Sequence, residues 1–187
     1  SHRAIDRQRR QLNVYQPTIV PKFTALGFAK QPMPRSLHAK LARYYTANYG
    51  SRTRERKEML DYGFGRQDVD VTDPYVVNLS PALRSEIGAV LKPFVEAFAG
   101  GVDLRYTMTY GLRAYQNHSF LKRHVDRIET HVVSVVLHLK HDIDRHWPLT
   151  IVGHDGKERA ITMEPGDMVI YEGAKCVHGR PYNLLGR

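Results

Sequence analysis

The residues best suited to chemistry are His124 and Asp126, which are separated only by Val125. Residues two apart on an extended chain project from the same side, so this imidazole and this carboxylate can bind one metal ion together. Two His and one carboxylate form the facial triad that holds non-heme Fe(II) with open coordination positions. Because a His-x-Asp triplet arises easily by chance, the surrounding sequence must decide whether it is half of such a site.

His178 is the strongest candidate for the second His. It follows the apolar run DMVIYEG, which predicts a strand that returns towards His124. Arg187 comes nine residues later. An oxygenase that uses a dicarboxylate co-substrate needs a buried cation remote from the metal, and a guanidinium binds a carboxylate bidentately. The other histidines are His2, His38, His118, His131, His138, His141, His146 and His154, and most of them are interpreted as surface or loop residues.

Length and composition indicate one globular domain. The chain has 187 residues, of which 42% are hydrophobic and 25% charged. No apolar run is long enough to cross a membrane, and no signal peptide opens the sequence as given. The lone Cys176 excludes an intrachain disulfide and favours a reducing compartment, the cytoplasm or nucleus.

Positive charge is concentrated in the first third of the chain. Residues 1–60 have a net charge of +10, whereas residues 61–187 have a net charge of −1. Such a basic segment can attract nucleic acid or an acidic protein. We expect instead a solvated flank, so nucleic acid is a possible but not a favoured partner.

Helices are predicted in the first half and strands in the second. One helix runs from Ser36, as its N-cap, to Gly50, and another from Ser80, with Pro81 at its first position, to Gly100–Gly101. Residues 51–75 predict a long loop that could act as a lid. Alternating apolar residues predict a strand over residues 104–110, and further strands are predicted in THVVSVVLHL, PLTIVGHDG, ERAITM and DMVIYEG. An extended segment is predicted in PTIVPKFTALGF.

Two stretches, YQNHSFLKRHVD and EPGDMVIYEGAKCVHGRPYNLLGR, resemble the 2-oxoglutarate- and Fe(II)-dependent dioxygenases, in particular their prolyl 4-hydroxylase branch. The resemblance covers roughly residues 103–187. It implies an α+β, mostly β fold: a double-stranded β-helix (jelly-roll) core over residues 101–187, backed by N-terminal helical support and the basic flank over residues 1–100. Relatives run on past the position of Arg187 into a last core strand, so we expect that strand to be lacking.

The resemblance also assigns roles to individual residues. It makes His124, Asp126 and His178 the iron ligands and Arg187 the anchor for the distal carboxylate of 2-oxoglutarate. It places Tyr115 beside the co-substrate and His138 where some relatives have a Tyr that helps to bind the distal carboxylate. Ser134, Val136 and His138 share one face of a strand and should line the co-substrate pocket. Leu121 departs from the family, since many prolyl hydroxylases have a Tyr there.

The sequence therefore predicts an enzyme that uses Fe(II), 2-oxoglutarate and O2, with ascorbate as a possible reductant, to hydroxylate a C–H bond. The branch implies a prolyl residue in a protein or peptide as the substrate. A free amino acid, another small molecule or a nucleic-acid base stays open, because one fold hosts many substrates. A binding module without catalysis, carrying a basic N-terminal arm, is the alternative from another class.

Overall fold

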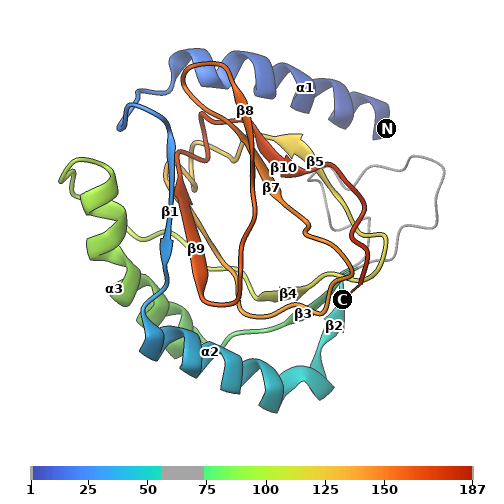
Figure 1. Ribbon diagram of the computed structural model, residues 1–187. Coiled ribbons are helices and arrows are strands. Elements are labelled where there is room, and N and C mark those ends of the chain that lie inside the picture. The colour runs from blue at the N-terminus through green and yellow to red at the C-terminus, as the bar shows by residue number, and fades with distance from the viewer. Residues whose placement is uncertain (1, 56–73, 187) are drawn as a thin grey trace.

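A computed structural model describes residues 2–55 and 74–186, which form three helices and antiparallel sheets (Figure 1). Helix α1 spans His2–Ile19, α2 spans Arg35–Asn48 and α3 spans Pro81–Phe98; a short 3-10 helix, η1, covers Tyr49–Ser51. None of the helices in the described ranges is long and apolar enough to cross a membrane. Most of the described strands follow α3 along the chain, as the sequence predicted.

Two sheets form the centre of the molecule. One has the order β1-β9-β6, with β1 at Phe28–Pro32, β9 at Asp167–Tyr171 and β6 at Ser134–Leu137. The other has the order β5-β10-β7-β8, and its strands span Leu121–His124, His178–Arg180, Leu149–Val152 and Glu158–Ile161 respectively. A small third sheet joins β2 (Thr53–Arg54), β3 (Tyr75–Val77) and β4 (Leu112–Ala114).

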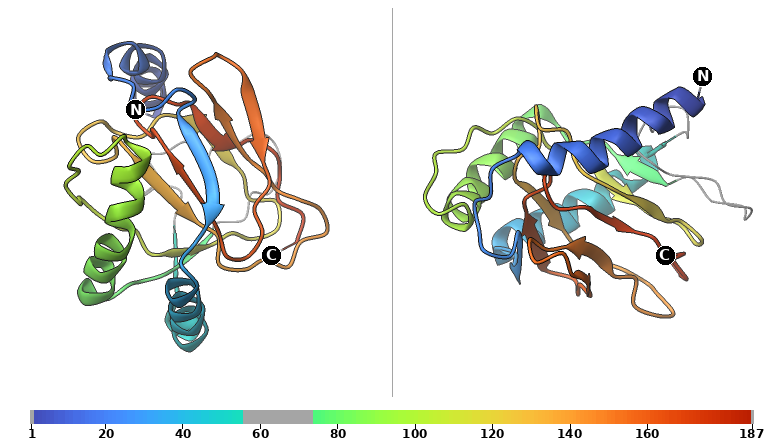
Figure 2. Two further views of the ribbon diagram at one scale, coloured as in Figure 1. Left: turned by 60° about the vertical axis from the view of Figure 1, so that its left-hand side comes forward. Right: turned by 90° about the horizontal axis from the view of Figure 1, so that it is seen from above.

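Strand β9 is buried on both of its faces. Met168 and Ile170 pack against the apolar sides of α2 and α3, which contribute Leu37, Leu41, Leu83, Ile87 and Leu91. Val169 and Tyr171 pack the other way, against Leu149 and Ile151 of the second sheet. Successive side chains of a strand point to opposite faces. One face of β9 therefore packs against α2 and α3, and the other packs against the second sheet. Figure 2 shows α2 and α3 on one side of β1 and β9.

The second predicted helix forms as expected. The Ser80 hydroxyl accepts a hydrogen bond from the N–H of Leu83, with Pro81 opening the helix, and Gly100 and Gly101 end it with positive φ angles. The first differs at its start: α2 begins at Arg35 without a side-chain cap, so Ser36 lies inside the helix. The extended segment predicted over residues 17–28 is helical at its start, because α1 runs through Pro17 to Ile19, and β1 begins only at Phe28.

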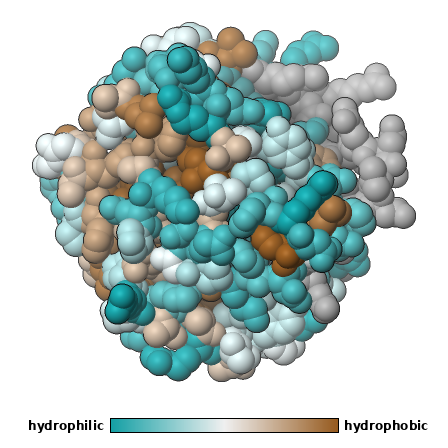
Figure 3. Space-filling model, in the orientation of Figure 1, coloured by the Kyte–Doolittle hydropathy of each residue, from teal (hydrophilic) through white to brown (hydrophobic). Residues whose placement is uncertain are grey.

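The strand predicted over residues 104–110 is wrong, since this segment has no regular structure and only Leu112–Ala114 forms a strand. Its alternating pattern has no described strand beside it to complete a hydrogen-bond ladder. Strand β6 pairs only with β9 among the described residues. Tyr106, Met108 and Tyr110 are consequently exposed by about half of their surface. Figure 3 shows apolar residues gathered between α3 and β1 on an otherwise largely hydrophilic face.

Candidate metal centre

Antiparallel pairing brings His124 and His178 together. His178 of β10 lies opposite His124 of β5 in the sheet, and their ring centroids are 4.5 Å apart. Asp126 follows β5, and its N–H donates a 2.8 Å hydrogen bond to the carbonyl of Gly173 at the end of β9. One nitrogen of each ring and one carboxylate oxygen lie within 4.8 Å of one another. In the described ranges, this is the only group of three His, Cys, Asp or Glu side chains with a metal-binding arrangement.

Both imidazoles are oriented by carbonyl groups of their own strands. Nδ1 of His124 lies 2.8 Å from the carbonyl oxygen of Lys122, and Nδ1 of His178 lies 2.8 Å from that of Cys176. A ring nitrogen that faces a carbonyl carries a proton, so in each neutral ring Nε2 is the atom that can bind a metal ion. The two Nε2 atoms lie 3.7 and 3.6 Å from Oδ1 of Asp126. Three donor atoms thus face a common point.

The two oxygens of the Asp126 carboxylate have different partners. Ser134 donates a 2.7 Å hydrogen bond to Oδ2, which leaves Oδ1 directed towards the two imidazoles. Burial acts to raise the pKa of Asp126, but the neighbouring His178, together with His124 and the Ser134 hydroxyl, outweighs it and lowers that pKa below its ordinary value. The carboxylate is therefore ionised, as a metal ligand must be.

Gly173 is required beside this carboxylate. A Cβ atom added at Gly173 would overlap both Oδ2 of Asp126 and Oγ of Ser134. Gly179, between the two buried residues His178 and Arg180 of β10, is also closely packed: an added Cβ would lie 2.8 Å from the carbonyl oxygen of Lys122. The site thus depends on two glycines for close approach of the backbone.

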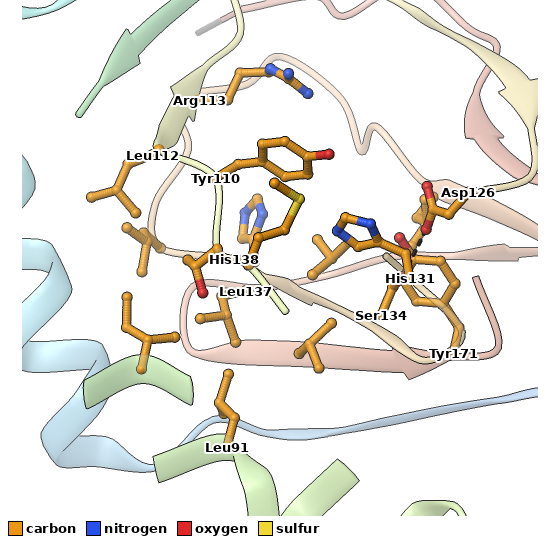
Figure 4. Close-up of a pocket in the computed structure, with 18 of the residues that line it drawn as sticks. Leu91, Tyr110, Leu112, Arg113, Asp126, His131, Ser134, Leu137, His138 and Tyr171 are labelled. Carbon is orange, nitrogen blue, oxygen red and sulfur yellow. Dashed lines mark hydrogen bonds between the residues drawn. The ribbon is translucent and has the colours of Figure 1, made fainter. Parts of the chain in front are cut away.

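A cavity of about 1160 Å³ extends from the metal ligands towards α3. Figure 4 shows Asp126, Ser134 and Tyr171 at one end and Leu91 at the other. Tyr115 lines this cavity. Ser134, Val136 and His138, which were predicted to share one face of a strand, line it as well. Tyr115 packs edge-on against Trp147, with ring centroids 4.8 Å apart. Nε2 of His138 lies 2.9 Å from Nδ1 of His141.

Other predicted features lie outside the described residues. Arg187 is one of them, and so are residues 56–73 of the expected lid loop. Cys176 is described and is 2% exposed. Burial and the nearby Glu172 carboxylate raise the pKa of its thiol to about 12, so it is not a nucleophile at neutral pH.

No family model and no curated protein sequence matches the chain. Among solved structures, a Pseudomonas putida prolyl-4-hydroxylase superposes with a TM-score of 0.63 at 19% identity, over 92% of this chain and 93% of that one. A Trichoplax adhaerens prolyl hydroxylase, solved with a peptide fragment of the hypoxia inducible factor oxygen degradation domain, gives 0.56 at 12% identity, over 98% and 85%.

The chain shares its fold with these hydroxylases. Its His-Asp-His group has the ligand set of the facial triad that holds non-heme Fe(II). The likeness supports a jelly-roll-like, mostly β architecture with helices on one side.

Helix α1 holds the loops around the metal ligands, which no local sequence signal indicated. Gln16 is 4% exposed, and its Nε2 donates to the carbonyl oxygens of Asp126 and Ala174, at 2.7 and 2.6 Å. The Asn13 side chain accepts a 2.9 Å hydrogen bond from the N–H of Val125. Lys175 in turn donates to carbonyl groups at the end of α1. Figures 1 and 2 show α1 lying across this end of the sheets.

His131 lies in a loop, and its side chain is in the cavity wall near the metal ligands, a position that the sequence did not indicate (Figure 4). Its ring stacks on that of Tyr110, with centroids 5.4 Å apart. Burial lowers the pKa of His131, so the ring is neutral at physiological pH. Arg180 was missed as well, although its place two residues after His178 on a strand is a signal that it faces the same side.

Proposed function

We propose that the protein is an Fe(II)- and 2-oxoglutarate-dependent dioxygenase that hydroxylates a C–H bond, with a prolyl residue of a protein or peptide as the substrate. The observation that carries the proposal is the convergence of His124 Nε2, His178 Nε2 and Asp126 Oδ1. Two neutral imidazoles and one carboxylate on a single side suit Fe(II) and leave coordination positions for other groups. The fold is proposed to be the double-stranded β-helix of that enzyme class.

The protein side chains have distinct tasks in this proposal. His124, His178 and Asp126 hold the metal, while Ser134 keeps the carboxylate oriented through its second oxygen. With 2-oxoglutarate and O2, the bound iron supplies the oxidation, and the co-substrate ends as succinate and carbon dioxide. Tyr115 and His138 line the space where the co-substrate binds. Arg187 as a carboxylate anchor stays a prediction of the sequence resemblance.

Three observations support a peptide as substrate. One structural neighbour was solved with a peptide fragment bound, and the other is a prolyl-4-hydroxylase. Tyr106 and Tyr110 lie in the cavity wall, exposed by 44% and 57%, where aromatic rings can pack on a pyrrolidine ring. Leu121 weakens the case for a prolyl substrate, because it lines the cavity where many relatives have a Tyr, so substrate contacts near the metal differ.

The test is incubation of the protein with Fe(II), ascorbate and 2-oxoglutarate on a panel of proline-containing peptides. We expect succinate release and a mass increase of one oxygen atom, located on proline by fragmentation. His178→Ala should abolish both, while Lys40→Ala, at an exposed ion pair outside the cavity lining, serves as the control. Oxidation of a free amino acid or a nucleobase, with unmodified peptides, would overturn the substrate and keep the cofactors. A protein that binds neither Fe(II) nor 2-oxoglutarate would be the binding module instead.

A further inference from the structure

Arg180 is a buried cation in the wall of the cavity. Its residue surface is 6% exposed, and it lies two positions after His178 on β10. The guanidinium donates to the carbonyl oxygen of Trp147 and lies 3.8 Å from the sulfur of Met163. Its central carbon is 4.5 Å from the centre of the Trp147 ring. These contacts fix the guanidinium in place, and none of them neutralises its charge.

No carboxylate of the described residues forms an ion pair with Arg180. Other arginines of the molecule are paired: Arg113 binds Glu55, Arg123 binds Glu158 and Arg159 binds Asp155. Arginine stays protonated in proteins, so burial cannot be relieved by loss of its proton. A buried charge without a counter-charge is costly. The position therefore favours an anion that enters the cavity.

The surroundings of Arg180 show where that anion would lie. Arg180 lines the cavity together with Tyr115, Tyr171 and His138. Two residues along a strand are separated by about 6.6 Å, and both side chains face the same side. The backbone positions of His178 and Arg180 are thus separated by roughly the length of an extended five-carbon dicarboxylate.

We propose that Arg180 binds the carboxylate remote from the metal in the 2-oxo dicarboxylate co-substrate. This inference rests on the proposed function and deepens it. It differs from the family resemblance, which gives this task to Arg187. Tyr115 packs on Trp147, and Trp147 packs on the guanidinium, which is itself buried. A carboxylate bound to a buried guanidinium makes strong charged hydrogen bonds.

The chain supplies its own reporter for the test. Trp147 is the only tryptophan and stacks on Arg180, so its fluorescence should change when an anion binds there. We would load the protein with Zn(II), which has no redox chemistry, and titrate it with 2-oxoglutarate. A second titration uses 2-oxobutyrate, which keeps the metal-chelating end and lacks the remote carboxylate. Wild type, Arg180→Gln, Arg180→Lys and Arg187→Gln are compared, with Arg123→Gln as a control at an exposed ion pair.

We expect wild type to bind 2-oxoglutarate much more tightly than 2-oxobutyrate. Arg180→Gln should weaken 2-oxoglutarate binding by about 30-fold or more and leave 2-oxobutyrate binding unchanged, because only the remote carboxylate loses its partner. Arg180→Lys should lie between the two, since a lysine cannot form the planar bidentate contact. Arg123→Gln should have no effect.

Three results would overturn the proposal. The first is unchanged 2-oxoglutarate affinity in Arg180→Gln, together with a loss in Arg187→Gln. The second, which needs no variant and so holds even if Arg180→Gln does not fold, is equal affinity of wild type for both 2-oxo acids. In either case the proposed function survives. The third is a metal-loaded wild type that binds neither 2-oxo acid, and this would overturn the proposed function as well.

Discussion

Helix α1 and the pair α2 and α3 are attached to the sheets in opposite ways. Helices α2 and α3 bury apolar side chains, among them Leu41 and Leu91, against Met168 and Ile170 of β9. Helix α1 is attached to the loops around the metal ligands through the amides of Asn13 and Gln16.

The apolar contacts of α2 and α3 stabilise the fold, whereas the hydrogen bonds of α1 set the geometry of the metal site. Apolar burial is non-directional and roughly proportional to area, so α2 and α3 stabilise the fold without fixing any one atom. Hydrogen bonds have strict distance and angle requirements. Those of Gln16 join Asp126 to Ala174, and hence the loop after β5 to the segment that leads to His178. Helix α1 therefore holds the two halves of the metal site at a set separation.

Removing the centre of the helix layer should have the largest effect on stability. Leu41 is fully buried, so Leu41→Ala should lower the free energy of unfolding by about 2–5 kcal/mol, through lost burial and the cavity left behind. Urea denaturation measures this. The metal affinity of the folded molecules should be unchanged. A parallel loss of metal affinity would show that the two regions are not independent.

Gly173→Ala should have the opposite effect, a loss of metal affinity with a smaller loss of stability. The added methyl group overlaps the Asp126 carboxylate and the Ser134 hydroxyl, so metal binding should be lost, while overpacking costs about 1–3 kcal/mol of stability. Co(II) titration followed by visible absorption measures the metal binding. Gly50→Ala is the control, because a Cβ there meets no atom within 4 Å. Retained metal binding in Gly173→Ala would contradict the close approach.

Gln16→Ala tests the attachment of α1 directly. It leaves two carbonyl groups without their donor, which should cost about 1–3 kcal/mol, and it should weaken metal binding by about 10-fold or more. The same Co(II) titration compares it with Thr18→Ala, on the exposed side of the same helix. If both variants bind metal equally well, α1 is only a structural helix.

Acid should lower the free energy of unfolding by a smaller amount, through His138 in the cavity wall. Burial, the charge of Arg180 and the neighbouring His141 lower the pKa of His138 to about 4, compared with about 6.5 in an unfolded chain. Between these values the unfolded state binds the extra proton, so the free energy of unfolding falls as pH drops from about 6.5 to about 4. His138→Gln should reduce this slope in urea denaturation series across pH, and His146→Gln should not.

Residues with local signals were predictable from the sequence. Ser80 and Pro81 start α3, and the cap was predictable because the Ser80 hydroxyl binds an N–H only three residues away. The apolar runs around Val152 and Val169 were predictable as strands from their own composition. The segment 104–110 failed because a strand also requires a partner at its edge.

Contacts between residues far apart in the sequence could not be predicted, because they also depend on a distant partner. Gln16 and Ala174 are 158 residues apart, and nothing around either residue indicates the other. The metal ligands were found because His-x-Asp is local, whereas the partner of His178 depends on the register of β10 against β5. Arg180 could have been found by extending the period-two reading past His178.

A crystal structure of the protein loaded with Fe(II) without oxygen, with anomalous diffraction at the iron edge, tests directly whether the three side chains bind one metal ion. We expect one strong peak per chain, bonded to Nε2 of His124, Oδ1 of Asp126 and Nε2 of His178, with Ser134 still bound to Oδ2. A peak at another group of side chains, or iron bound through fewer than these three residues, would contradict it.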